Sequence, residues 1–363
     1  MRIHLFSLFL PHLYTIPVVP ERINMTQHLR AAITAIGHYL PSEVLTNDDI
    51  AKMVDTSDEW ITTRVGIHQR HILRDRTEGA SVLGVEAIRD LVRRHPVDLS
   101  TIDMVICSTN SPDYIFPSTA SIIAAEVGIP DGAPCYDFQA ACSGFIFGLQ
   151  IARGFVESGL YRRILLVTAE KNSYFANPSD RSTLPLFGDG GAATLIEPTE
   201  DEVGVIDLLI GNKNIGHRDD LIIPAGGSAR PASHETIENG EHFIKMNGRV
   251  IFKCAVTTMG ETSAEMLARN GLTKDQVTWV VPHQANLRIM SAVADRLELP
   301  MDRLLVNIGH CGNTSSSSIP IVLSECESRI RRGDNIVLTA FGAGLTYGTA
   351  LLKWAYDTPV EQE

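Results

Sequence analysis

A strand-forming pattern that occurs twice is the feature that most constrains the fold of this 363-residue chain. Three apolar, strand-like segments occur in the first half and again, in the same order, in the second half. They are residues 100–107, 164–169 and 192–195, matched by residues 275–282, 335–340 and 348–351. We therefore expect two similar halves, residues 25–200 and 201–363. Ligand sites lie preferentially between such units, so we expect the site where the halves meet.

Segments with helical patterns alternate with the strand-like segments, which favours an α/β fold built of layered sheets and helices. Thr46 and Asp49 have the spacing of a capping box, so we expect a helix to begin after Thr46. The other expected helices cover residues 118–127 and 143–157. The expected strands cover 31–36, which Gly37 ends, and 104–107, 133–138, 163–169, 192–196 and 304–307.

The charge and cysteine content narrow the class of protein. A formal net charge of -12 makes the chain a poor nucleic-acid binder, because contacts to phosphate groups need a cationic surface. None of the six cysteines forms a CxxC pair or a zinc-binding spacing, so we expect reduced thiols in a cytoplasmic protein. No segment is long and apolar enough to span a bilayer, so no membrane association is expected.

The first 24 residues differ from the rest of the chain. Residues 4–19 are apolar in patches but are interrupted by Pro11, His12 and Pro17, and no small-residue cleavage site follows them. We expect residues 1–24 to be an extension outside the fold, with Met25 as the better beginning. A signal peptide is the alternative interpretation.

Cys142 is the first candidate catalytic residue. It lies between an expected strand and an expected helix, within Gln139-Ala140-Ala141-Cys142-Ser143-Gly144. A thiol at a helix N-terminus faces partial positive charge and free N–H groups, which favour the nucleophilic thiolate. Other enzymes also place a nucleophile on a strained turn between strand and helix. A buried structural cysteine is the alternative, but the small neighbours leave room for a substrate.

Polar and glycine-rich loops in the second half could face the same site. His283 follows an apolar strand, and the internal repeat places its loop at the same edge as the loop after Cys107. Asn313 lies among the small residues 309–318 and could donate a side-chain N–H group into a pocket. The glycine-rich segment 341–345 could aim backbone N–H groups at a developing oxyanion. Each of these segments, taken alone, could be an ordinary loop.

Two other patterns indicate different chemistry and are rejected. Residues 188–193 fit the GxGxxA fingerprint of dinucleotide-binding proteins, which requires a helix to follow. Residues 192–196 are expected to form a strand, so nucleotide binding is not expected there. His310 and Cys311 could form a metal-binding pair, but the sequence offers no further ligand at a useful spacing, and no metal site is expected.

The candidate segments together resemble the beta-ketoacyl-acyl-carrier-protein synthase III family of the thiolase superfamily, over roughly residues 30 to 355. Several long motifs in the same order make this resemblance specific. It implies a thiolase-like, five-layered αβαβα fold of two pseudo-repeated halves, and a homodimer. The motifs are Tyr39-Leu40-Pro41, Asp55-Thr56-Ser57-Asp58-Glu59-Trp60-Ile61, Ala140-Ala141-Cys142-Ser143-Gly144-Phe145, Phe187-Gly188-Asp189-Gly190, Pro282-His283-Gln284-Ala285-Asn286-Leu287-Arg288 and Gly312-Asn313-Thr314-Ser315.

The resemblance implies that Cys142 is the nucleophile and that His283 and Asn313 complete a catalytic triad. Cys142 would take an acyl group from acyl-CoA and release CoA. Malonyl-acyl-carrier protein would then bind, and His283 and Asn313 would stabilise the enolate that forms when CO2 is lost. The enolate would attack the acyl-cysteine, whose oxyanion the N–H groups of Cys142 and Ala343 would hold. No cofactor would be needed, because acyl-CoA is a substrate.

The resemblance also implies which residues bind the substrates. Trp60 and Arg181 would hold the CoA adenine, with Thr56 and Arg64 nearby; for the two arginines, an ordinary surface ion pair is the alternative. Phe116 would enter the floor of the acyl pocket from the partner subunit. Carrier proteins are acidic, so this acidic enzyme would need a local basic patch to attract one. Its residues would be Arg249, Lys253, Arg288 and Arg296.

Three residues depart from the common pattern of the family. Ala343 stands where many members have glycine, Tyr347 replaces a common tryptophan, and Arg249 replaces a common asparagine. Ala343 keeps its backbone N–H group, so it can still contribute to an oxyanion hole.

The leading functional hypothesis is initiation of fatty acid synthesis from a short acyl-CoA. The closest alternative is a sister condensing enzyme of secondary metabolism with a different acyl starter, since the same triad would serve both. Chain-elongating synthases pair the cysteine with two histidines and thiolases use a second cysteine, whereas Asn313 holds the third position here. A non-catalytic scaffold that binds carrier protein is an alternative of another class, and retention of all three triad residues argues against it.

Overall fold

The computed structural model describes residues 29–213 and 216–358. The proposed extension, residues 1–24, lies outside the described residues. Within the described part, no helix combines the length and the apolar character that crossing a membrane requires.

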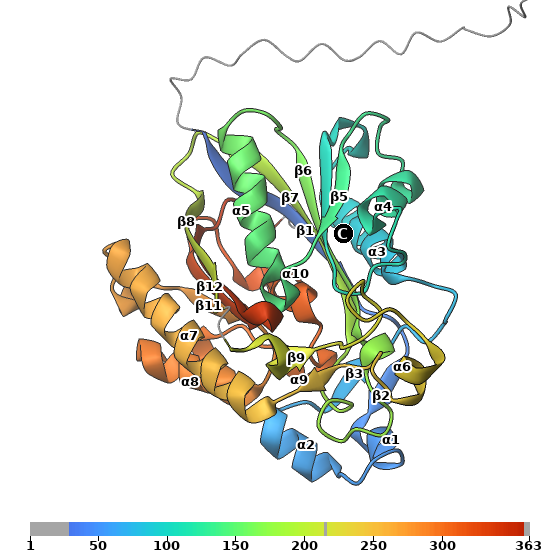
Figure 1. The fold of residues 1–363 in the computed structure, drawn as a ribbon. Helices are drawn as coiled ribbons and strands as arrows, with labels where there is room; N and C mark the ends of the chain where they lie inside the picture. Colours follow the sequence, from blue (N-terminus) through green and yellow to red (C-terminus); the bar gives the residue numbers. More distant parts are fainter. Residues whose placement is uncertain (1–28, 214–215, 359–363) are drawn as a thin grey trace, which may run out of the picture.

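Two sheets with matching topology form the frame of the molecule (Figure 1). In the strand orders given at the end of this paragraph, the first two strand pairings of each sheet are antiparallel and the third is parallel. This repeated order is what a duplicated chain would give, and the expected division near residue 200, which stays a prediction, falls between the two sheets. The first sheet contains, side by side, β1 (Arg30–Tyr39), β7 (Asp189–Thr199), β6 (Ile164–Lys171), β4 (Met104–Ser108) and β5 (Cys135–Phe138), and the second contains β8 (Gly204–Asn212), β13 (Thr346–Lys353), β12 (Asn335–Gly342) and β11 (Trp279–Pro282).

Helices fill the layers between and outside the sheets, which gives the expected five-layered αβαβα arrangement (Figure 1). The central layer is apolar on both sides, and buried side chains such as Ile106 and Leu338 pack there in one core. Between the sheets lie α5 (Gly144–Glu157) and α10 (Ser318–Glu325), outside the first sheet lie α3 (Ala80–Arg94) and α4 (Thr119–Val127), and outside the second lie α7 (Gly248–Arg269) and α8 (Leu287–Leu297).

Shorter elements connect this frame. Between β1 and α3 lie β2 (Val44–Thr46), α1 (Asn47–Ala51), α2 (Asp58–Val65) and β3 (Gln69–His71). Between β8 and α7 lie β9 (Leu221–Ile222), α6 (His234–Glu238) and β10 (Lys245–Met246), and α9 (Ile308–Cys311) precedes α10. Single 3-10 turns are η1 (Leu99–Thr101), η2 (Ala141–Ser143), η3 (Asn172–Phe175), η4 (Arg218–Asp220), η5 (Lys274–Gln276), η6 (Met301–Arg303), η7 (Ser315–Ser317), η8 (Glu327–Arg329) and η9 (Ala343–Leu345).

Most expectations for local structure are confirmed. Thr46 caps α1 and Asp49 completes the capping box, as its spacing predicts. The first strand, however, does not end at Gly37 but continues to Tyr39. Gly37 lets α3 pack directly on the strand, because a Cβ at this position would lie 2.3 Å from the backbone nitrogen of Leu91.

The strand expected over residues 304–307 is wrong except for one bridge between Leu304 and Val280. The backbone N–H of Asn307 donates to the side-chain oxygen of Gln284 at 3.0 Å, and the chain then turns into α9. A side chain therefore replaces the neighbouring strand as the hydrogen-bond partner.

Gly188 joins the two halves beside α9. Its N–H donates to the carbonyl oxygen of Asn313 at 3.1 Å, and the N–H of Asn313 donates to the carbonyl oxygen of Leu186 at 2.8 Å. A Cβ on Gly188 would lie 2.3 Å from the carbonyl oxygen of Cys311. The glycine-rich segment that mimics a nucleotide fingerprint thus leads into strand β7 and acts as a backbone joint that fixes Asn313.

We predict that Gly188→Ala destabilises the protein by about 1–3 kcal/mol, because the new methyl group meets backbone atoms that cannot move aside. Chemical denaturation measures the free energy of unfolding. Gly154→Ala in α5 is the matched control, since no atom lies within 4 Å of its added Cβ. Alanine is the better helix former there by about 1 kcal/mol, so the control should be neutral or stabilising. Equal effects of the two substitutions on stability would contradict the role of Gly188 in the close backbone contact with the segment that carries Asn313.

Candidate active site

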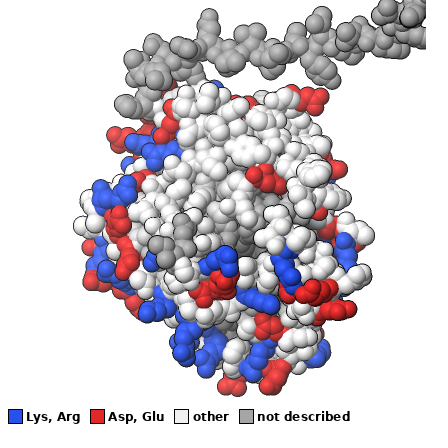
Figure 2. Space-filling model, in the orientation of Figure 1, with Lys and Arg blue, Asp and Glu red and all other residues white. Residues whose placement is uncertain are grey.

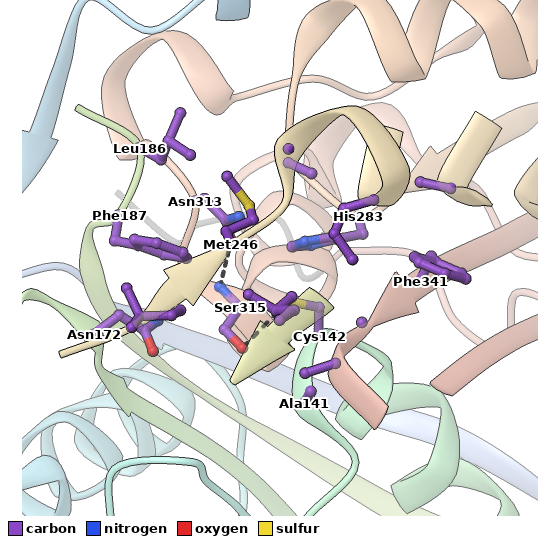
Figure 3. Close-up of a pocket in the computed structure, with 18 of the residues that line it drawn as sticks. Ala141, Cys142, Asn172, Leu186, Phe187, Met246, His283, Asn313, Ser315 and Phe341 are labelled. Atoms are coloured by element: carbon purple, nitrogen blue, oxygen red, sulfur yellow. Dashed lines mark hydrogen bonds between the residues drawn. The ribbon is translucent and has the colours of Figure 1, made fainter. Parts of the chain in front are cut away.

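A cavity of about 620 Å³ lies where the two halves meet, and side chains from both halves line it. Most of the lining side chains are apolar, including Phe341 and Met246. Figure 3 shows Cys142, His283 and Asn313 around this space, each carried by a different segment of the chain. The three candidate catalytic residues from the sequence are therefore brought together in one cavity.

The turn that carries Cys142 is strained, as its position between strand and helix predicts. Ala141, the preceding residue, has a φ of 47°, in the left-handed region that non-glycine residues avoid. Gly342 packs against this turn, since a Cβ there would lie 2.6 Å from the backbone nitrogen of Cys142. The backbone that leads into Ala343 is thus held beside the nucleophile, and both Cys142 and Ala343 line the cavity.

Burial opposes the thiolate form that the helix N-terminus favours. Burial raises the pKa of the Cys142 thiol to about 12; a hydrogen bond from Ser315 Oγ, 3.5 Å from the sulfur, lowers this pKa, and the charge of Glu170 raises it. Burial of the negative charge therefore acts against the helix N-terminus that the sequence indicated.

His283 is a neutral hydrogen-bond donor in this arrangement. Burial lowers the pKa of its imidazole to about 3. Its Nδ1 lies 2.7 Å from Ser318 Oγ, and this oxygen accepts the backbone N–H of Gln284 at 3.4 Å. When the Ser318 hydroxyl donates to Nδ1, the ring hydrogen is on Nε2, which is the tautomer that donates into the cavity.

Asn313 is also oriented as a donor. Its Oδ1 accepts the backbone N–H of Ser315 at 2.9 Å, which leaves its amide NH2 group to donate into the cavity (Figure 3). The cavity therefore brings one thiol together with two N–H donors that carry no charge, those of His283 and Asn313. Such donors can stabilise an oxyanion that develops between them.

Sequence reasoning missed the residues that hold this site. Glu170 at the end of β6 is fully buried, and it accepts hydrogen bonds from the backbone N–H of Asn110 at 3.0 Å and from Ser316 Oγ at 2.6 Å. Burial raises the pKa of Glu170 to about 7. The Asn110 amide also reaches Ser315 Oγ at 3.1 Å, which links the network to Cys142. The four serines of residues 315–318 were the only signal of this network in the sequence, and they did not indicate which residues they contact.

Three of the four residues expected to bind CoA lie together. The guanidinium groups of Arg181 and Arg64 lie 5.0 and 6.0 Å from the ring centre of Trp60, whose side chain is partly exposed. Trp60 and Arg181 line the cavity, and Arg181 contacts the exposed Asp55 at 3.6 Å. The hydroxyl oxygen of Thr56 is buried and finds no hydrogen-bond partner within the described residues.

The expected basic patch is only partly assembled. The guanidinium of Arg288 lies 5.6 Å from the ring centre of Phe252, which lines the cavity, and the exposed Lys253 follows Phe252 in α7. Arg249 is exposed at the start of the same helix. Figure 2 shows that Lys and Arg side chains on this face gather over its lower half, with acidic side chains among them.

Arg296 packs on a later turn of α7 than Phe252. Its side chain packs along Gly260 of α7, which lies about 12 Å further along the helix axis than Phe252. The sequence could not reveal this, because the packing of α8 on α7 decides which turn each residue faces.

Phe116 lies in an exposed apolar segment. The exposed fractions of Tyr114, Ile115 and Phe116 are 62%, 90% and 83%. Contiguous exposed apolar side chains mark interaction sites. This exposure is what insertion into a partner subunit would require, and the insertion itself stays a prediction.

Comparisons with known proteins agree with the geometry. Two family models match: "3-Oxoacyl-[acyl-carrier-protein (ACP)] synthase III" over residues 136–214, and its C-terminal counterpart over residues 267–354. A beta-ketoacyl-[acyl-carrier-protein] synthase III of Porphyromonas gingivalis is 52% identical over 329 residues, which are 91% of this chain and 98% of the relative.

Solved structures give the same result. The synthase III of Thermus thermophilus is 40% identical, with a TM-score of 0.81 over 89% of this chain and 99% of that chain. The priming beta-ketosynthase of the R1128 polyketide pathway is 32% identical, with a TM-score of 0.82 over 92% and 98% of the two chains. The identity and the coverage together show that this chain belongs to the beta-ketoacyl-[acyl-carrier-protein] synthase III family.

Proposed function

We propose that this chain condenses a short acyl-CoA with malonyl-acyl-carrier protein, with loss of CO2, to give 3-oxoacyl-acyl-carrier protein and initiate fatty acid synthesis. The observation that carries this proposal is the convergence of Cys142, His283 and Asn313 on one cavity, as one thiol and two uncharged N–H donors. Membership of a family of condensing acyltransferases supports it.

The first half-reaction is acyl transfer to Cys142. Its sulfur attacks the thioester carbonyl, a new carbon–sulfur bond forms, and the bond to the CoA sulfur breaks. The thiol proton leaves with CoA, so acyl-Cys142 and free CoA are the products. The N–H groups of Cys142 and Ala343 hold the oxyanion of the tetrahedral intermediate.

The second half-reaction begins when malonyl-acyl-carrier protein loses CO2. The electron pair of the broken carbon–carbon bond moves toward the thioester oxygen, where His283 Nε2–H and Asn313 Nδ2–H stabilise the enolate. The enolate carbon attacks acyl-Cys142, the carbon–sulfur bond breaks, and the released thiolate takes up one proton. A neutral imidazole suits this step, because it donates a hydrogen bond without giving up its proton.

The proposal includes the partners of the enzyme. The CoA adenine stacks between Trp60 and Arg181, with Thr56 and Arg64 beside it. The acidic carrier protein docks on a patch that consists of Arg249, Lys253 and Arg288. The protein acts as a cytoplasmic homodimer in which Phe116 of each subunit enters the acyl pocket of the other. The reaction uses no cofactor, because neutral donors and a thiol supply every step.

A second candidate function is priming of a secondary-metabolic pathway. The observation that favours it is the likeness to the priming beta-ketosynthase of a polyketide pathway, which is 32% identical to this chain. The chemistry at Cys142 would be the same, and only the acyl group that the cavity accepts would differ.

We predict that incubation with acetyl-CoA adds one acetyl group to Cys142, which intact-protein and peptide mass spectrometry can locate. Cys142→Ser should lose the rapid adduct, whereas Cys326→Ser, the matched control at another free thiol, should keep it. No adduct on any residue would support a non-catalytic scaffold. In a panel of starters, fastest labelling by branched or aromatic acyl-CoAs would favour the polyketide alternative.

We predict that His283→Ala and Asn313→Ala each slow decarboxylation of malonyl-acyl-carrier protein by about 10²–10³-fold, the usual loss for one oxyanion donor. Both variants should still become acylated at Cys142, and His234→Ala, at an exposed histidine, should retain both steps. Release of labelled CO2 measures the rate.

The same assay tests the charge of His283. Because burial lowers its pKa to about 3, the imidazole stays neutral as pH falls from 8 to about 5. The rate of decarboxylation by the unaltered enzyme should therefore not fall in a titration whose midpoint lies near the ordinary pKa of histidine. Normal decarboxylation by His283→Ala would refute the assigned role.

We predict that Arg288→Glu raises the KM for malonyl-acyl-carrier protein about fivefold or more, since an exposed charge pair contributes up to about 1 kcal/mol and charge reversal adds repulsion. Labelling by acetyl-CoA should be unchanged. Arg296→Glu, which lies outside the patch, is the matched control. The effect should shrink at high salt, because exposed charges are screened. An unchanged KM would count against the docking patch.

A further inference from the structure

Outside the cavity, three side chains that can ligate metal ions converge beside α9, and a fourth lies close to one of them. The ligating atoms of His310, Cys311 and Glu325 all lie within 4.8 Å of one another. Glu325 Oε1 lies 3.0 Å from His310 Nε2 and 4.0 Å from Cys311 Sγ. The fourth side chain is His38 at the end of β1, whose Nε2 lies 3.9 Å from the same carboxylate oxygen.

The three separations to Glu325 Oε1 are close to the ligand–ligand separations of a tetrahedral site. Zinc binds nitrogen and oxygen ligands at about 2.0–2.2 Å and sulfur at about 2.3 Å, which places the ligand atoms about 3.3–3.7 Å apart. The separations of 3.0, 3.9 and 4.0 Å around Glu325 bracket this range. Two imidazoles, one thiol and one carboxylate form a donor set that suits zinc and cobalt rather than magnesium or calcium.

Neighbouring residues already orient two of these ligands. His38 Nδ1 lies 2.9 Å from Ser324 Oγ, so its Nε2 is the nitrogen left for an ion. The Asn307 amide donates to Glu325 Oε2 at 2.9 Å, which leaves Oε1 on the side of the other ligands. Hydrogen-bonded partners of this kind orient the ligands in known metal sites.

The site is also open to solvent, and a nearby positive charge is neutralised. The side chain of His310 is 48% exposed, which provides a path for an ion. Arg94 lies close to His38, but it pairs with the carboxylates of Asp90 and Glu327.

We propose that His38, His310, Cys311 and Glu325 bind one divalent transition-metal ion of the zinc or cobalt type. Binding would release the thiol proton of Cys311 and the Nε2 proton that His310 shares with Glu325, and the ion would replace that contact. Spacing in the sequence missed this site because His38 and Glu325 reach it through the fold.

An ion at this position would tie β1, α9 and α10 together. Cys311 lies two residues before Asn313, so the ion would also restrain the loop that carries Asn313. An ion that binds only the folded protein stabilises it by mass action.

Titration of the full chain with Co²⁺ tests the proposal, because tetrahedral Co²⁺ has strong visible absorption and a bound thiolate adds a charge-transfer band. We expect one equivalent to produce both features. His310→Ala and Glu325→Gln should weaken Co²⁺ binding more than about 100-fold, since loss of an outer partner alone costs 10–100-fold. Cys311→Ser should lose the charge-transfer band.

Two cysteine variants serve as controls. Cys326→Ser and Cys142→Ser should keep the full spectrum, and loss of the band in Cys142→Ser would place the ion in the catalytic cavity instead. Because the side chain of Cys311 is buried, its variant could fail to fold, and the exposed His310 supplies the second measurement. Zn²⁺ should raise the Tm of the unaltered protein but not of His310→Ala. A weak octahedral Co²⁺ spectrum would overturn the proposal, and so would equal Tm shifts in the unaltered protein and in His310→Ala. The cluster would then be an ion pair without a metal site.

Discussion

Close packing of two helix starts is the constraint on which the site depends. The turns η2 and η7 lead into α5 and α10, and each contains a residue in the left-handed region: Ala141 with φ 47° and Ser315 with φ 51°. They meet at the hydrogen bond of 3.5 Å between Ser315 Oγ and the sulfur of Cys142. Gly144 allows this approach, because a Cβ there would lie 3.0 Å from the Cβ of Ser316. The groups from the two halves face one cavity only because the central helices begin side by side.

Burial has the same effect on Cys142, Glu170 and His283. It raises the pKa of Cys142 to about 12 and that of Glu170 to about 7, and it lowers the pKa of His283 to about 3. Each shift disfavours the charged form of the group. Charge then develops on the substrate, where uncharged N–H donors are already in place. Few solvent molecules need to reorganise during the reaction, which is the condition under which such donors act best.

The sequence predicts the repeated strands well because their apolar patterns are strong, and it indicates Cys142, His283 and Asn313 because each lies in a short segment between longer elements. It fails where tertiary packing decides. The carboxylate of Glu170 follows an apolar strand, and nothing local indicates which hydrogen bonds it accepts. The expected thiolate reflected the helix N-terminus, whereas the depth of burial is set by residues from the other half. The turn of α7 that Arg296 faces is likewise decided by helix packing rather than by spacing in the sequence.

Each half also carries a connecting segment at the same point of its topology, between the first strand of the sheet and the long outer helix. In the first half this segment bears Trp60, and in the second half it bears Ile222, Ile244 and Met246, all of which line the cavity. The reacting groups instead stand on the repeated frame. Part of the cavity wall is therefore formed by segments that do not carry the reacting groups. The connecting segments can diverge and reshape this wall while the frame, with its strained turns and close backbone contacts, stays unchanged.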